Sequence, residues 1–152
     1  MIYHDALLSY VHFVFAFIVF GTLAAEAFVL RLPVTSDVMK LLTRIDLFYG
    51  IAAVGVLVAG VGRVFGGAKG AGYYAGEPFF WAKLVAFLAV GLISIVPTMT
   101  FSRWRNASKA DAAFAPTADA VKQTRRLVMI EVHVFALIPL FAALMARGIG
   151  AG

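Results

Sequence analysis

The stretch that decides the fold runs from Leu7 to Leu30 and reads LLSYVHFVFAFIVFGTLAAEAFVL. It is longer than the roughly 20 apolar residues that a helix needs to cross a bilayer. Only His12 and Glu26 within it carry side chains that can be charged near neutral pH. Polar and apolar residues do not alternate along it, so the stretch predicts a membrane-spanning helix rather than a strand of a membrane barrel.

Three further runs have the same character. Of the 152 residues, 62% are hydrophobic and only 14% are charged, whereas soluble domains contain about half and about a quarter. One small globule cannot bury so much apolar surface. The sequence therefore predicts an all-α integral membrane protein, a four-helix bundle that forms a single domain over residues 1–152. Its spans are expected at about residues 7–30, 47–64, 79–101 and 127–146.

The basic residues between the spans predict how the chain lies in the membrane. Most of them lie between spans one and two or between spans three and four: Arg31, Lys40, Arg44, Arg103, Arg105, Lys109, Lys122, Arg125 and Arg126. The positive-inside rule therefore places these two loops in the cytoplasm, and both termini and the middle loop outside. The same distribution accounts for the net charge of +5, so the expected partner is the lipid bilayer and no nucleic acid is expected.

Shorter signals concern the connections and the packing. The middle segment GGAKGAGYYAGEP lacks the residue order and the preceding strand of a phosphate-binding loop, so it is expected to be a flexible connector. Pro116 and Thr117 indicate a helix start ahead of span four. Span two is dense in glycine and alanine, which permits close approach of a neighbouring helix.

The ionisable residues within the spans fall into two layers. His12 and Lys83 each lie about 10 Å to the outer side of the midplane, and Arg63 lies at a similar depth. A second layer on the cytoplasmic side contains Glu26, Asp46, Glu131 and His133. Ionisable groups inside a membrane are costly and usually functional, so both layers are candidate sites.

Helical periodicity indicates which of these side chains face the bundle interior. At about 100° per residue, two stripes form: Leu8, His12, Val19 and Glu26 on span one, and Lys83, Val90, Ser94 and Phe101 on span three. Because polar groups avoid lipid, both stripes are expected to face inward. Glu131 and His133 are two residues apart and point to nearly opposite sides, so only one of them can be interior.

Some of these residues also have a purely structural interpretation. Lys83 is close enough to the outer interface to extend its amine towards water. Glu26 could form an ion pair with Arg31 at the end of span one. Asp46, at the start of span two, is typical of a helix cap.

Haem is the cofactor that the histidines suggest. Imidazole is the commonest protein ligand for haem iron, and four-helix bundles build such sites between facing helices. The absence of cysteine excludes covalent c-type attachment, so His12 and His133 are candidate metal ligands for haem b. They differ by about 15 Å along the membrane normal, which argues against one shared haem and leaves open one haem or two.

Two motifs resemble a known group. YVHFVFAFIVFGTLAAEAFVLR, residues 10–31, resembles the first span of HemJ-type protoporphyrinogen oxidases and the related CopD-like four-helix membrane proteins. FWAKL, residues 80–84, resembles the start of the HemJ third span, whose lysine is functional. The resemblance implies His12 and Lys83 as the matching pair, with haem b as cofactor and protoporphyrinogen IX as substrate.

The chain departs from that group further along span three. There VGLISIVPTMTF, residues 90–101, lacks the Tyr-His of HemJ-type proteins. The whole chain looks closest to an uncharacterised bacterial four-span family beside HemJ and CopD, which implies a multi-pass protein of the bacterial cytoplasmic (inner) membrane.

The leading hypothesis is a membrane b-type haem protein acting in electron transfer or oxidoreduction. His12 would bind the iron, Arg63 would contact the cofactor, and Lys83 would be a sixth ligand, a propionate partner or a proton-relay group. Glu26 and Lys83 are the candidate catalytic residues. With His133, the inner layer would support a second haem, quinone chemistry or proton uptake, and the expected partners include a quinone, a porphyrin, a redox protein or a second copy.

Two alternatives stay open. One is the HemJ-like oxidation of protoporphyrinogen IX in haem synthesis. The other is a small transporter or metal-handling protein, although scattered methionines and the absence of cysteine do not favour soft metals.

Overall fold

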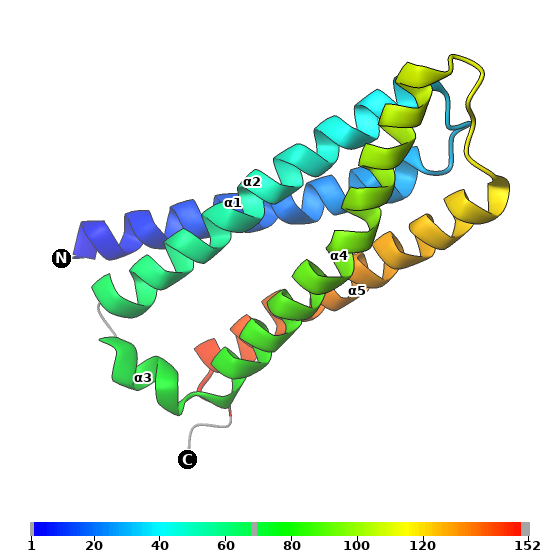
Figure 1. The fold of residues 1–152 in the computed structure, drawn as a ribbon. Coiled ribbons are helices and arrows are strands. Elements are labelled where there is room, and N and C mark those ends of the chain that lie inside the picture. The colour runs from blue at the N-terminus through cyan, green and yellow to red at the C-terminus, as the bar shows by residue number, and fades with distance from the viewer. Residues whose placement is uncertain (1, 68–69, 150–152) are drawn as a thin grey trace.

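The computed structural model describes residues 2–67 and 70–149. It contains helices α1 (Ile2–Val29), α2 (Ser36–Gly66), α3 (Gly70–Gly76), α4 (Pro78–Ala110) and α5 (Ala118–Ala146). Four of them, α1, α2, α4 and α5, are long and apolar enough to cross a membrane. They run side by side as an elongated bundle, and no strand occurs in the described part (Figure 1). The predicted all-α, four-span membrane architecture is therefore confirmed.

Helices α2 and α5 begin ahead of their apolar runs, because threonine side-chain caps rather than hydropathy set where they start. Thr35 caps α2 by accepting a hydrogen bond from the Val38 amide at 3.4 Å. Thr117 caps α5 in the same way, through the Ala120 amide at 3.3 Å, which confirms the predicted helix start. Since α2 begins at Ser36, Asp46 lies well inside the helix, and the expectation that it caps this helix is wrong.

The four long helices form two hairpins. Helix α1 packs mainly against α2, and α4 packs mainly against α5, whereas contacts between the hairpins are fewer. Glycines of α2 bring the first pair close together, as predicted. A Cβ added at Gly55 would lie 2.6 Å from the Phe15 ring, and Gly62 lies against Leu8. The Phe15 ring thus occupies the space that any side chain at position 55 would need.

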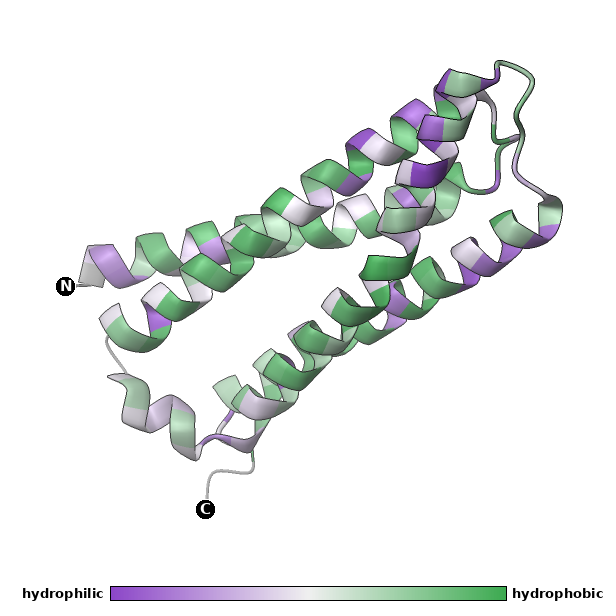
Figure 2. Cartoon of the chain, viewed as in Figure 1, coloured by the Kyte–Doolittle hydropathy of each residue, from purple (hydrophilic) through white to green (hydrophobic). Residues whose placement is uncertain are grey.

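The two ends of the bundle differ in charge. The loops at residues 30–35 and 111–117 lie together at one end, here called the loop end (Figure 1). The N-terminus, α3 and the end of α5 lie at the opposite end, here called the terminal end. Hydrophilic residues gather near the loop end (Figure 2). The structure therefore confirms that the two basic loops share one side; that this side is cytoplasmic stays a prediction.

The buried core fills the middle of the bundle and the loop end. The middle cluster contains Val19, Leu23, Tyr49, Ala52, Val56, Val90 and Phe135. The loop-end cluster contains Ala27, Leu30, Met39, Leu42, Phe101, Trp104 and Val128. The buried members of these clusters do not reach the third of the bundle nearest the terminal end, where the hairpins diverge (Figure 1) and only partly buried residues such as Phe87 and Ile138 continue the middle cluster.

The connection between the hairpins contains the short helix α3, in a segment expected to be a flexible connector. Gly70, at its start, has a φ of 72°, a left-handed conformation that glycine adopts without strain. Tyr74 is buried, and its ring centroid lies 5.3 Å from that of Phe80 on α4. This aromatic packing holds a helical turn that a glycine-rich composition does not favour by itself.

Candidate functional site

His12 lies on α1 where that helix packs against α2, towards the terminal end of the bundle. Its Nδ1 donates a hydrogen bond to the carbonyl oxygen of Val56 at 3.1 Å. Gly60 of α2 lies beside the ring, since a Cβ at that position would be in van der Waals contact with the imidazole Cε1 at 3.4 Å. With Nδ1 held by a backbone carbonyl, the ring presents Nε2 to any further partner.

Two cations lie close enough to His12 for their charges to act on it, namely Arg63 of α2 and Lys83 of α4. The Arg63 guanidinium stacks over the Phe13 ring at 5.7 Å, and its buried Nε has no hydrogen-bond partner. The Lys83 amine lies 3.6 Å from the Met145 sulfur on α5. The structure therefore brings the three outer-layer candidates into one region contributed by α1, α2 and α4.

His133 is placed differently from His12. It lies on the exposed face of α5, and its Nδ1 bonds the carbonyl of Met129 in its own helix at 2.6 Å. Glu131 takes the interior position instead, with only 1% of its surface exposed. The question of which residue of this pair is interior is thereby answered, and His133 does not face His12 across the bundle.

The inner layer is built around two buried carboxyl groups. Glu26 of α1 is 2% exposed and Glu131 of α5 is 1% exposed. In each side chain Oε1 is buried without a hydrogen-bond partner, and Glu131 lies close enough to Glu26 to act on it electrostatically. Among the described residues Glu26 and Arg31 form no ion pair, and the Arg31 guanidinium lies over the Phe28 ring at 5.2 Å instead.

Helices α2 and α4 complete this layer. Asp46 Oδ1 accepts a hydrogen bond from Thr98 at 2.7 Å. The Tyr49 hydroxyl lies near that of Ser94, and close enough to Glu26, Asp46 and Glu131 to interact electrostatically. All four long helices thus contribute to one polar centre, here called the inner acidic centre: Glu26, Asp46, Tyr49, Ser94, Thr98 and Glu131.

Sequence reasoning missed Tyr49 and Thr98 as members of this centre. A signal was available, because Asp46 and Tyr49 are three residues apart and Ser94 and Thr98 are four apart, spacings that share a helix face. The predicted inward stripes are confirmed by burial, since Val19 and Glu26 on α1 and the Val90–Phe101 part of the α4 stripe are buried.

The side chains of residues 2–67 and 70–149 form no cluster with the geometry of a metal site. Within these ranges, no group of three or more His, Asp or Glu residues is placed to hold a metal ion. Haem iron needs only one or two axial protein ligands, so a haem site requires no such cluster of side chains.

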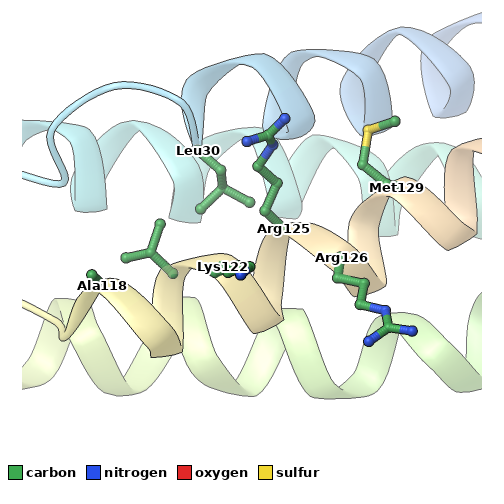
Figure 3. A pocket seen from close by; sticks show the side chains of 7 residues that line it. Leu30, Ala118, Lys122, Arg125, Arg126 and Met129 are labelled. Atoms are coloured by element: carbon green, nitrogen blue, oxygen red, sulfur yellow. The ribbon is translucent and has the colours of Figure 1, made fainter.

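A small basic pocket of about 380 Å³ lies at the loop end (Figure 3). Helix α5 contributes Lys122, Arg125 and Arg126, and α1 contributes Leu30. The Arg125 side chain points towards α1, whereas that of Arg126 points away from it (Figure 3). Positive groups at this position fit an interface with anionic lipid headgroups, in keeping with the predicted cytoplasmic side.

Fold and site together define a helical, four-span integral membrane protein with ionisable groups inside its bundle. Comparison with known families gives a more specific placement. The chain belongs to the family DUF2214, described as a predicted membrane protein, whose model matches residues 4–150. No curated protein and no solved structure matches the chain significantly.

Proposed function

We propose that the protein is a b-type haem protein of the bacterial cytoplasmic membrane that takes part in electron transfer or oxidoreduction. His12 is the proposed axial ligand. The observation that carries the proposal is the hydrogen bond from His12 Nδ1 to the Val56 carbonyl. Metal-binding histidines are typically held in this way through the nitrogen that does not bind the metal, which fixes the ring and the tautomer.

The surroundings of His12 fit a haem in two further respects. Haem b carries two propionate groups, and the cations Arg63 and Lys83 both lie near His12. In addition, the His12 side chain is only half-buried, so part of the ring stays open to a further partner.

His133 faces away from the interior, so we assign it no axial ligand role within one chain. When bound, the haem would supply reversible one-electron chemistry. His12 would hold the iron through Nε2, while Arg63 and Lys83 would offset the propionate charge, which is costly to bury in a membrane.

Absorption spectroscopy tests this function. Purified protein, reconstituted with hemin if necessary, should show Soret and α-band changes on reduction, with about one haem per chain. His12→Ala should abolish these bands, and the matched control His133→Ala should retain them. The proposal fails if the wild-type protein binds no haem after reconstitution, or if His12→Ala binds it as well as wild type.

A narrower activity, oxidation of protoporphyrinogen IX, is supported by the placement of Lys83 near His12, the two residues matched by the HemJ resemblance. Under it, the gene should restore growth to a bacterial strain that lacks its own oxidase, and Lys83→Ala should abolish the rescue. Absence of rescue at verified expression would refute this activity while leaving haem binding to be judged by the spectra.

A further inference from the structure

The groove between α2 and α4 lies on the lipid-facing side of the inner acidic centre. It has a volume of about 830 Å³, and apolar side chains such as Leu57, Phe87 and Leu92 form most of its lining. Gly50 and Gly91 line it from opposite helices, and a Cβ added at either would meet no atom within 4 Å. The groove is therefore wide because both helices present a glycine to it.

Polar groups line one part of this groove. Asp46, Tyr49, Ser94 and Thr98 all contribute to its lining. Ser94 Oγ donates to the Gly91 carbonyl at 2.8 Å, a bond within its own helix. Because hydroxyl hydrogens rotate to suit a partner, either Tyr49 or Ser94 can donate to an oxygen atom in the groove.

The depth of these hydroxyls restricts what could reach them. Ser94 lies nine residues before Arg103, or about 13 Å along the helix from the basic loop end. Phospholipid headgroups remain at the interface, and acyl chains at this depth carry no hydrogen-bonding atom. The occupant must therefore combine an apolar body with a compact oxygen-bearing head that is itself soluble in the bilayer.

The buried carboxyl groups further restrict the class of ligand that fits the groove. Tyr49 is 6% exposed and lies between the groove and the interior, within electrostatic reach of Glu26 and Glu131. Both glutamates are almost fully buried and have an Oε1 without a partner. Such groups suit a ligand whose oxygen atoms exchange protons, which a quinone ring does and a hydrocarbon or a simple ester does not.

We propose that the α2–α4 groove is a binding site for a membrane quinone, whose ring oxygen accepts a hydrogen bond from Tyr49 or Ser94. The quinone tail lies along the apolar walls of the two helices. This site is separate from the His12 region, so quinone binding does not require haem.

Binding of decylubiquinone to the purified protein in detergent micelles tests the site, with tryptophan fluorescence as the readout. Gly50→Leu and Gly91→Leu, made separately, should each weaken binding at least tenfold by filling the groove. Gly21→Leu is the matched control, because Gly21 is exposed on α1, is not among the groove residues and has no atom within 4 Å of an added Cβ. It should bind as wild type does.

The hydrogen bond is tested by Tyr49→Phe, which should weaken binding about two- to tenfold. Tyr10→Phe, at an exposed tyrosine of α1, should not. Decylbenzene, which has the tail and a ring but no oxygen, should not bind saturably. His12→Ala should keep wild-type quinone affinity, so failure of haem binding and failure of this proposal are distinguishable.

Three results would overturn the proposal. The first is wild-type affinity in both Gly50→Leu and Gly91→Leu. The second is an equal loss in Gly21→Leu, which would indicate simple partitioning into micelles. The third is saturable binding of decylbenzene at the affinity of decylubiquinone, which would show that the polar groups of the groove recognise nothing.

Discussion

Replacement of Glu26 by methionine should stabilise the folded bundle, although it removes one of the carboxyl groups beside the proposed quinone site. Glu26 is 2% exposed, and its Oε1 has no hydrogen-bond partner. A buried polar group left unsatisfied costs about 1–3 kcal/mol. Methionine has a similar length and helix propensity and carries no charge, so Glu26→Met should raise the free energy of unfolding by about 1–3 kcal/mol.

Denaturant unfolding in detergent micelles, followed by circular dichroism, measures this change. Phe17→Met on the same helix is a suitable control, because Phe17 is 75% exposed and its replacement should change stability little. Glu26 and Glu131 interact electrostatically, so the double variant is expected to deviate from the sum of the two single effects. A loss of more than about 1 kcal/mol in Glu26→Met would refute the reasoning, since it would mean that the carboxyl makes stabilising bonds.

Three further predictions concern packing, the exposed histidine and orientation. Gly55→Ala should destabilise the bundle by about 1–2 kcal/mol, because the new Cβ would lie 2.6 Å from the Phe15 ring. Overpacking costs about 1–3 kcal/mol, and the better helix propensity of alanine offsets this only in part. An unchanged free energy of unfolding would contradict this prediction. His133→Ala should alter stability by less than about 0.5 kcal/mol in the same assay, because the side chain is exposed and bonds only its own helix, and a larger loss would point to an unrecognised partner. The chain has no cysteine, so a single introduced cysteine reports the predicted orientation. Ala71→Cys should react with a membrane-impermeant thiol reagent on intact cells, whereas Ala112→Cys should react only after permeabilisation. The reverse pattern would overturn the orientation.

Hydropathy was sufficient to place the four spans, because the bilayer imposes a length and a composition on each of them. It did not show where the helices begin, because Thr35 and Thr117 cap polar extensions that carry the basic residues. Helical periodicity correctly placed Val19 and Glu26 inside, since one residue rotates the helix face by a known angle.

The inner acidic centre was only partly predictable. The Thr98–Asp46 hydrogen bond joins α4 to α2, so it depends on the relative rotation and depth of two helices, which no single span encodes. The choice between Glu131 and His133 depended in the same way on how α5 meets its neighbours. Pairing of the helices into two hairpins, and the groove left between α2 and α4, likewise arise from contacts between segments.

The hairpin organisation bears on how the protein is assembled during synthesis. Helices α1 and α2 are complete before α4 leaves the ribosome, and each hairpin makes most of its contacts internally. The first hairpin can therefore insert into the membrane before the second, and α3 connects the two. The inner acidic centre draws on both hairpins, so it can form only after they dock. Until then Asp46 lacks the hydrogen bond that Thr98 of α4 donates to it.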